Sequence, residues 1–290
     1  MSRAGLALRA VRLAATRSTA DPTPDYDVAS DTYDDAFTSV MGTHSTALLE
    51  QLRIEPGDDV VELACGTGHL TSQIVRRLGP TGSLTVVEKS GGMLAVARAK
   101  VVGHAAPGVR LTWYQDDMMA RLSRLPDRSA NVVVVGWAIC YAKPVALLRE
   151  AARVLRPGGQ IGIIETRADA LRTLRSAFED VVAADPSMLT GLIRVNLPKG
   201  ASELSRWFRR AGLRAEVIRE GDQEWPCRTA ADALEWVERS GAGAGFRDSF
   251  DMSREAVIRA RLYDALQRAE QRSGGLRLAH PFVVGVARAA

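Results

Sequence analysis

Short apolar runs alternate with amphipathic patterns along most of the chain. Aliphatic and β-branched residues form seven runs of strand length, at residues 59–63, 83–88, 110–114, 131–136, 161–165, 215–219 and 282–287. Apolar residues recur at helical spacing in most of the intervals, at residues 70–78, 93–100, 145–155, 170–183 and 203–211. Because short strands alternate with helices, the pattern predicts a doubly wound α/β sheet of mostly parallel strands.

Two segments lie outside this alternation. Residues 26–52 carry two helical patterns before the first strand, and residues 221–275 separate the last two strands. The second segment contains an amphipathic helix that ends at Gly274 and Gly275, and it holds five of the chain's sixteen aromatic residues. Inserted helices rich in aromatic residues are candidates for a lid over an apolar ligand, and ordinary core packing is the alternative.

Composition excludes several classes of protein. With 290 residues, 46% hydrophobic and 25% charged, the chain is expected to be globular, and no run reaches the roughly 20 apolar residues of a membrane helix. Its cysteines and histidines are scattered: Cys65, Cys140, Cys227, His44, His69, His104 and His280. This spacing disfavours a disulfide framework and a zinc site, so we expect no bound metal.

The net charge of +4 comes from one end of the chain. Residues 1–20 contain four arginines and no acidic residue, and the remainder has 34 basic against 34 acidic residues. The neutral body disfavours nucleic acid as a partner. The tail has the composition of a transit peptide, but its arginines do not gather on one helical face, and it lacks the apolar core of a secretory signal. We expect a flexible extension, disordered or loosely helical, on a cytoplasmic protein. Because only four of the basic residues are lysine, we expect a bacterium with a GC-rich genome.

A glycine-rich turn follows the first predicted strand, in the sequence VVELACGTGHLT. Gly66 and Gly68 allow positive φ angles and a close approach of a ligand to the start of the next helix. A dinucleotide fingerprint requires a third small residue where Thr71 stands. Glu62 at the strand end would repel a pyrophosphate and attract a ligand with ammonium and sulfonium groups, such as S-adenosylmethionine (SAM).

Glu88 ends the second predicted strand, twenty residues after Gly68. A carboxylate at that position can accept hydrogen bonds from both hydroxyls of a ribose, in an NAD site or in a SAM site. Ser90 is placed to cap the following helix, and Met93 falls on the first turn of that helix, where it can pack against adenine.

Four motifs together resemble those of class I SAM-dependent methyltransferases, and more closely the ubiquinone/menaquinone-biosynthesis methyltransferase-like group, which includes small-molecule and natural-product enzymes. The motifs are ELACGTG, VVEKSGGML, YQDDMM and REAARVLRPGGQIGI. The resemblance runs from about Tyr26 to the last strand. It implies a Rossmann-like, seven-stranded sheet with the last strand antiparallel.

The resemblance also implies a set of cofactor-binding residues. Glu62, Gly66 and Gly68 would surround the methionine part of SAM, and Glu88 would hold the ribose. The remaining members of the implied set are Tyr26, Tyr33, Ala64, Lys89, Met93, Asp117 and Met118. Asp117 would accept from the adenine amino group with the Met118 backbone beside it, and one of the two tyrosines would cover the SAM carboxylate. Asp116 and Asn131 depart from the family, which has glycine and aspartate there.

On this basis we divide the chain into residues 1–22, the flexible extension, and residues 23–290, a single methyltransferase domain. Within the domain we expect N-terminal lid helices over 23–56 and a SAM-binding core over 57–220. A helical acceptor lid would occupy 221–276 and the last strand 277–290.

The acceptor is poorly encoded, because methyl transfer requires mainly that a nucleophile be held near the methyl group. GWAICY follows the fourth strand in place of the Asn/Asp-Pro-Pro-aromatic motif of amino-methylating nucleic-acid enzymes, and Cys140 is not preceded by proline. As catalytic candidates we single out His44 and Tyr141. His44 is a general-base candidate, with a satisfied core histidine as the alternative, and Tyr141 is a candidate acceptor contact. Glu165, at a strand end, is a further acceptor contact, and His69 is expected to be solvated.

Three functions therefore compete. The first is a SAM-dependent methyltransferase that acts on oxygen or carbon of an apolar metabolite, probed by turnover of SAM to S-adenosylhomocysteine. The second is a non-methylating protein that keeps SAM, as a cyclase or a binding partner. The third is an NAD-dependent oxidoreductase, against which Glu62 and Thr71 argue. The sequence allows a homodimer.

Overall fold

The computed structural model describes residues 3–16, 20–105, 107–225 and 227–290. Its internal contacts divide the chain into two compact units. The helical unit consists of Met1–Ala36, Asp169–Arg194 and Gln223–His280, and the sheet unit of Phe37–Ala168, Val195–Asp222 and Pro281–Ala290.

The sheet unit is built on seven strands in the order β3-β2-β1-β4-β5-β9-β6. The strands are β1 (Asp59–Leu63), β2 (Ser83–Glu88), β3 (Arg110–Gln115), β4 (Ala130–Gly136), β5 (Leu155–Thr166), β6 (Arg214–Gly221) and β9 (Phe282–Arg288). Neighbours from β3 to β5 pair in parallel, and β9 runs antiparallel to both β5 and β6. The predicted Rossmann-like sheet with an antiparallel last strand is confirmed, and every predicted run falls inside an observed strand.

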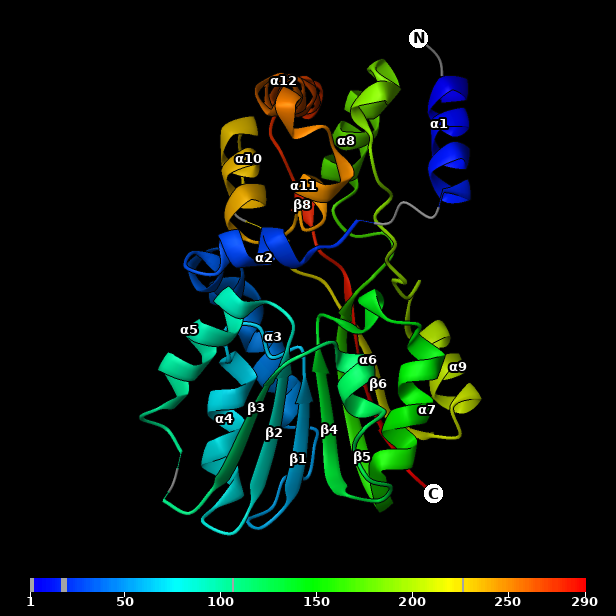
Figure 1. The fold of residues 1–290 in the computed structure, drawn as a ribbon. Helices are drawn as coiled ribbons and strands as arrows, with labels where there is room; N and C mark the ends of the chain where they lie inside the picture. Colours follow the sequence, from blue (N-terminus) through cyan, green and yellow to red (C-terminus); the bar gives the residue numbers. More distant parts are fainter. Residues whose placement is uncertain (1–2, 17–19, 106, 226) are drawn as a thin grey trace. The chain divides into compact units, whose positions relative to one another are not determined.

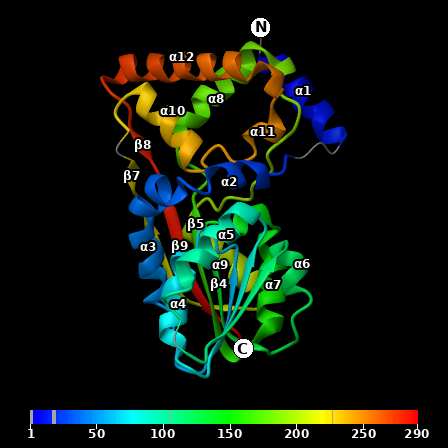
Figure 2. The same cartoon turned by 60° about the vertical axis from the view of Figure 1, so that its left-hand side comes forward.

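Helices cover both faces of this sheet (Figures 1 and 2). One face carries α3 (Ser39–Leu49), α4 (His69–Leu78) and α5 (Gly91–Val101), and the other carries α6 (Met118–Leu122), α7 (Pro144–Val154) and α9 (Ala201–Arg210). A short 3-10 turn, η2 (Ile139–Tyr141), follows β4. Because the middle strands are covered on both faces, they are apolar throughout rather than alternating, and residues 132–135 of β4 are at most 1% exposed.

The helical unit contains α1 (Arg3–Ala15), α2 (Thr23–Ala29), α8 (Arg172–Ala184), η3 (Pro186–Met188), α10 (Ala230–Arg239), α11 (Phe246–Ser249), η4 (Met252–Arg254) and α12 (Glu255–Ser273), with a two-stranded ribbon of β7 (Glu224–Trp225) and β8 (Leu278–Ala279). The predicted helix stop is confirmed, since α12 ends at Gly274 in the left-handed conformation (φ 69°). A π-helical turn, η1 (Asp34–Thr38), lies where the chain passes from the helical to the sheet unit.

The helical unit differs from the predicted lid in two respects. It includes residues 169–194, which the sequence assigned to the SAM-binding core, because α8 packs along α12. It also includes α1, where a flexible extension was expected. Leu13 is buried, Arg9 Nε donates to the Leu189 carbonyl at 2.9 Å, and α1 contacts α8 and η3. Residues 1, 2 and 17–19 of the expected extension, and residue 226 of the expected lid, lie outside the described residues.

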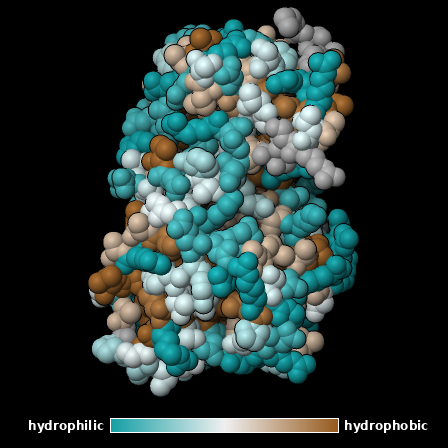
Figure 3. Space-filling view, in the orientation of Figure 1, coloured by the Kyte–Doolittle hydropathy of each residue, from teal (hydrophilic) through white to brown (hydrophobic). Residues whose placement is uncertain are grey.

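On the face shown in Figure 3, hydrophilic side chains predominate, with smaller hydrophobic patches between them. Within the described ranges, no helix combines the length and the apolar character that are needed to span a bilayer.

Candidate functional site

The strand order reverses its direction between β1 and β4. The chain proceeds outward from β1 to β2 and β3 on one side and from β4 to β5 on the other. At such a switch point the loops after the two strands part and leave a crevice at the carboxyl ends, where doubly wound sheets bind ligands. The residues that follow β1 and β4 are therefore the first to consider.

The loop after β1 turns sharply into helix α4. Ala64, Gly66 and Gly68 all have positive φ angles, of 56°, 55° and 81°. A methyl group on Gly68 would lie 2.9 Å from Cβ of Ala97 in α5, whereas one on Gly66 would meet no atom within 4 Å. Gly68 is thus required for the turn and for packing. Gly66 leaves open space above the loop, and the strained Ala64 marks a backbone that the surrounding structure holds in place.

Helix α4 begins at this loop with glycine at its N-cap. Gly68 supplies no side-chain cap, so the first-turn amides are open to a ligand that carries acceptor atoms. Ala64, Gly66 and Gly68 therefore lie together in one turn beside the helix N-terminus, as the sequence predicted. Their contact with a cofactor stays a prediction.

Glu62 lies directly below the loop and is only 2% exposed. Burial raises its pKa to about 8, and the negative charge of the nearby Glu88 adds to the rise. Among the described residues, Oε2 of Glu62 has no hydrogen-bond partner, nor has the buried hydroxyl of Thr71. An unpartnered buried carboxyl oxygen is costly unless a donor arrives from a ligand. The site therefore fits a ligand that presents an ammonium group to Glu62.

Glu88 at the end of β2 ties the glycine loop to the next turn. Its two carboxylate oxygens accept from the backbone amides of Gly66 (2.9 Å) and Ser90 (2.8 Å). Each oxygen can accept more than one hydrogen bond, so the carboxylate can hold the loop and still receive ribose hydroxyls. The sequence did not predict the bond to Gly66, which gives Glu88 a second, structural role.

The residues after β2 and β3 form the adjoining wall of the site. Ser90 caps α5 as predicted, accepting from the Met93 amide at 3.1 Å, and Met93 is buried on the first turn. Asp117 caps α6 through Oδ1, which accepts from the Met119 and Ala120 amides at 2.9 and 3.0 Å. Asp117 is exposed, and its Oδ2 has no hydrogen-bond partner among the described residues, so it remains free to accept from an amino group.

The other residues of the implied set lie in several elements. Met118 is buried on the first turn of α6, and Lys89 is exposed beside Glu88. Tyr26 lies in α2 of the helical unit and Tyr33 just before η1, so no single helix carries both, yet their rings meet edge to face at 6.3 Å. Their predicted contact with the SAM carboxylate is not tested by this arrangement.

The two departures from the family pattern have structural partners of their own. Asp116 forms ion pairs with Arg121 (2.8 Å) and Arg124 (2.9 Å) on and after α6. Asn131 accepts from the Asp59 amide at 3.0 Å and also contacts Arg156, which joins the bottoms of β1, β4 and β5. Asp116 and Asn131 therefore stabilise the structure around them and have no part in the glycine loop.

An aromatic cluster, made of Phe37, His44, Trp137 and Phe282, lies at the carboxyl end of β4 and β5. Trp137 directly follows β4 with φ 57°, and its indole Nε1 donates to Ser45 Oγ of α3 at 2.8 Å. Its ring meets Phe37 and Phe282 edge to face, each at 5.7 Å, and the His44 ring lies 4.5 Å from Phe282. Three segments far apart in sequence thus converge here.

Of this cluster the sequence singled out only His44. Trp137 had a usable signal, because it is the first residue after a strand at the switch point. Phe282 had none in the local pattern, since it begins β9 and pairs in register with Thr166 at the end of β5. Gly221, opposite Phe282, makes room for that ring, because a methyl group there would come within 2.2 Å of it.

The loop after β4 is fixed by two polar side chains. Glu165, buried at the end of β5, accepts from the backbone amides of Cys140 (3.0 Å) and Thr166 (2.8 Å). Asn196 Nδ2 donates to the Ala142 carbonyl at 2.8 Å, and the backbone N–H of Asn196 donates to the Cys140 carbonyl. Burial raises the pKa of Glu165 to about 7, although its hydrogen bonds oppose the rise. Glu165 therefore positions the loop, and Tyr141 in η2 packs partly buried against the sheet core.

His69 is not solvated as the sequence led us to expect. Its Nε2 lies within hydrogen-bond distance of the Gly42 carbonyl (3.0 Å) and of the Thr46 hydroxyl (3.1 Å), both in α3. Gly42 favours this close approach, since a methyl group there would lie 3.0 Å from the imidazole. His69 therefore joins α4 to α3. Over the residues that the structure describes, no group of three or more histidine, cysteine or acidic residues is arranged to hold a metal ion.

Comparisons with known proteins agree with this geometry. A family model described as a methyltransferase domain matches residues 60–159, which include the glycine loop, Glu88, Asp117 and β4. The demethylmenaquinone methyltransferase of Symbiobacterium thermophilum is 30% identical over 164 residues, which cover 53% of this chain and 62% of that protein. Across the first curated relatives the chain spans 48–62% of their length.

Solved structures share the fold over most of the chain. A Bacillus halodurans protein described as a methyltransferase is 17% identical with a TM-score of 0.57, covering 85% of this chain and 99% of that one. The [4+2]-cyclase SpnF is 18% identical with a TM-score of 0.51, covering 85% of this chain and 80% of its own. With the glycine loop and the strand order, these findings show a methyltransferase domain over residues 60–159 on a Rossmann-like fold, similar in sequence to demethylmenaquinone methyltransferases.

Proposed function

We propose that this protein transfers a methyl group from SAM to an oxygen or carbon atom of an apolar, ring-bearing small molecule. The observation that carries the cofactor part is the buried, unpartnered Oε2 of Glu62 beneath a glycine loop whose Gly66 leaves open space. An ammonium group can donate a hydrogen bond to that oxygen, whereas the negative charge of a pyrophosphate would be repelled by it.

SAM supplies a methyl group bonded to a positively charged sulfur. A nucleophile attacks the methyl carbon in line with the carbon–sulfur bond. In our proposal Glu62 binds the amino group of the methionine part, and the α4 amides bind its carboxylate. Glu88 receives the ribose hydroxyls while its bond to Gly66 keeps the loop in place. Asp117 accepts from the adenine amino group with Met93 packed nearby. The protein then contributes mainly position and the exclusion of water.

The aromatic cluster supports the acceptor part of the proposal. Trp137, Phe37 and His44 are partly exposed and Phe282 is buried, so the cluster offers aromatic edges and faces to a flat apolar molecule. His44 is the side chain there that can take up a proton from a hydroxyl or an activated carbon. Tyr141, which like Trp137 follows strand β4, is the second candidate for a catalytic residue.

The same proposal includes the compartment, the metabolic role and the class of acceptor. We place the reaction in the bacterial cytoplasm and in secondary metabolism, with a small-molecule acceptor rather than a nucleic acid. The free state of Cys65, Cys140 and Cys227 supports a reducing compartment. The even balance of acidic and basic residues beyond the tail argues against a polyanionic acceptor.

A non-methylating role is the alternative. The fold likeness to the cyclase SpnF, at 18% identity, favours neither role for this chain. Purified protein incubated with SAM and a panel of phenolic, quinone and polyketide acceptors separates the two. Formation of S-adenosylhomocysteine that depends on both protein and acceptor supports methyl transfer. Tight SAM binding with an acceptor that is converted but gains no methyl group supports the alternative.

A further inference from the structure

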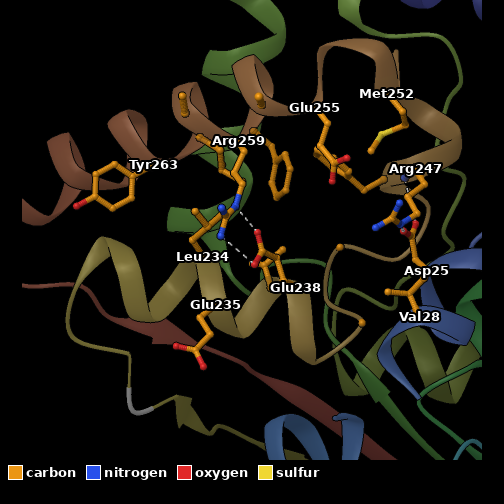
Figure 4. Close-up of a pocket in the computed structure, with 18 of the residues that line it drawn as sticks. Asp25, Val28, Leu234, Glu235, Glu238, Arg247, Met252, Glu255, Arg259 and Tyr263 are labelled. Atoms are coloured by element: carbon orange, nitrogen blue, oxygen red, sulfur yellow. Dashed lines mark hydrogen bonds and ion pairs between the residues drawn. The ribbon is translucent and has the colours of Figure 1, made fainter. Parts of the chain in front are cut away.

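A pocket of about 1410 Å³ lies wholly within the helical unit (Figure 4). Its two long walls are the facing sides of α10 and α12, and α11 with η4 closes one end. Asp25 and Val28 of α2 and Phe178 of α8 complete the lining. Since all of these elements belong to one unit, the pocket does not depend on the sheet unit.

Helical spacing accounts for the open space between these two walls. The α10 wall presents residues 231, 234, 235 and 238, and the α12 wall presents residues 256, 259, 260 and 263, each set recurring at three- and four-residue intervals. Ala231, Ala256 and Ala260 occupy positions where a larger side chain would fill the gap. Below them Leu234 and Leu262 form a buried apolar floor.

The charges around this pocket are unequal. Five carboxyl groups line it against two guanidinium groups. Arg259 points toward Glu238 across the pocket (Figure 4), with Nε–Oε1 at 2.6 Å and Nη2–Oε2 at 3.2 Å. Arg247 lies 3.4 Å from Asp25. Each of the two arginines therefore forms an ion pair with one of the carboxyl groups.

Three carboxyl groups remain. Glu235 pairs with Arg239 outside the pocket at 3.0 Å, which leaves two acidic groups in excess. Among the described residues, no ion pair within 4 Å involves Glu255 or Asp264, and both are exposed at the rim formed by α12. Arg259, which pairs with Glu238, interacts with Glu255 only at longer range. A rim of surplus negative charge over an apolar floor repels an anion and attracts a cation that brings its own apolar surface. Ligand pockets generally combine such a floor with a few polar groups that fix orientation.

We propose that this pocket binds a small molecule with an apolar ring system and a protonated amine. The ring would lie on Leu234 and Leu262 between the alanines of the two helices, and the ammonium group would face Glu255 and Asp264. This inference goes beyond methyl transfer. It also stands independently of it, because none of these residues belongs to the glycine loop or to the aromatic cluster.

The test uses two fluorescent probes that share a ring and differ in charge, naphthylethylamine and naphthylpropionate, titrated into the full-length protein by calorimetry. We expect the amine to bind at one equivalent with at least about tenfold higher affinity than the carboxylate, and its affinity to fall as salt is added. Equal affinity for the two probes, or no binding of the amine, overturns the proposal.

Variants locate the binding. Ala260→Trp fills the space between the helices and should abolish amine binding, and Glu255→Gln with Asp264→Asn should lower it several-fold. Glu179→Gln, an exposed carboxylate of α8 outside the pocket, is the matched control and should bind as the parent does. Unchanged amine binding in Ala260→Trp would contradict the proposal. SAM affinity, measured in parallel, should be the same in all four proteins, so a failure here is distinguishable from a failure of the SAM site.

Discussion

The Gly66 amide donates to the Glu88 carboxylate at 2.9 Å, so the acid at the end of β2 holds the turn at the end of β1. The same carboxylate accepts from Ser90, the cap of α5. One side chain thus fixes the positions of both backbone segments that face the proposed cofactor. Glu88 therefore fixes the geometry of the loop and is also the residue that we propose to bind the ribose.

Glu88→Ala should weaken SAM binding by at least about tenfold, because a charge-assisted hydrogen bond is worth roughly 1.5–3 kcal/mol and several are lost together. Calorimetric titration measures the change, and circular dichroism checks that the variant folds. Glu179→Ala, which alters an exposed carboxylate of α8, is the control. Parent-like affinity in Glu88→Ala would remove Glu88 from the binding site.

SAM binding should release a proton from Glu62 near neutral pH. Burial raises the pKa of this group to about 8, so it is mostly protonated in the free protein at pH 7. An ammonium group beside it favours the carboxylate and lowers that pKa on binding. Titrations at about pH 6.5, where a free α-amino group is still protonated, in buffers of different ionisation enthalpy measure the release. Glu62→Gln should show none, and equal proton release from that variant would assign the proton to another group.

Gly68→Ala should lower the free energy of unfolding by more than the cost of the left-handed backbone conformation alone. An alanine held in the left-handed region costs about 1–2 kcal/mol, and overpacking against Ala97 adds about 1–3 kcal/mol. Gly212→Ala provides a matched control, since Gly212 has nearly the same φ (80° against 81°) but no atom within 4 Å of the position that a methyl group would take. Urea denaturation of both variants gives the difference, and equal losses would show that the contact with Ala97 relaxes without cost.

Glu165 should make the stability of the ligand-free protein fall as pH rises from about 4.5 towards 7. Burial raises its pKa to about 7, so across this range the folded state binds more protons than the unfolded state. Glu165→Gln cannot ionise and should flatten that part of the pH profile, measured by urea denaturation at several pH values. A profile of unchanged slope would mean that Glu165 is already ionised in the folded protein throughout the range.

Ser45→Ala should cost about 1–2 kcal/mol of stability, because it leaves the indole N–H of Trp137 without its acceptor in a partly buried position. Thermal and urea unfolding measure the loss. SAM affinity should stay at the parent value, since Ser45 and Trp137 lie on the acceptor side of the proposed site. A drop in SAM affinity equal to that of Glu88→Ala would place Trp137 in the cofactor site instead.

Local pattern was sufficient to predict the sheet. Strands such as β4 are apolar on both faces and bounded by turns, and a run like residues 131–136 is typical of a strand that is buried on both faces of a parallel sheet. The glycine turn and the Ser90 cap were also predictable, because a positive φ and a helix N-terminus each demand particular residue types at particular positions.

Features built from distant segments were not predictable in this way. The aromatic cluster depends on β9 returning between β5 and β6, which places Phe282 beside Trp137, and no local spacing records that return. The hydrogen bond between His69 and the Gly42 carbonyl depends on two helices packing so closely that a methyl group on residue 42 would lie 3.0 Å from the imidazole. The helical unit draws residues 169–194 and α1 together through contacts with α8, and the sequence shows α8 only as one more amphipathic helix.

Parallel calorimetric titration of the purified protein with SAM, S-adenosylhomocysteine and NAD tests the central claim most directly. We predict micromolar binding of the first two ligands and no heat from NAD. Binding of NAD, with silence from SAM and S-adenosylhomocysteine, would contradict the claim, and would mean that the buried Glu62 does not select against a pyrophosphate.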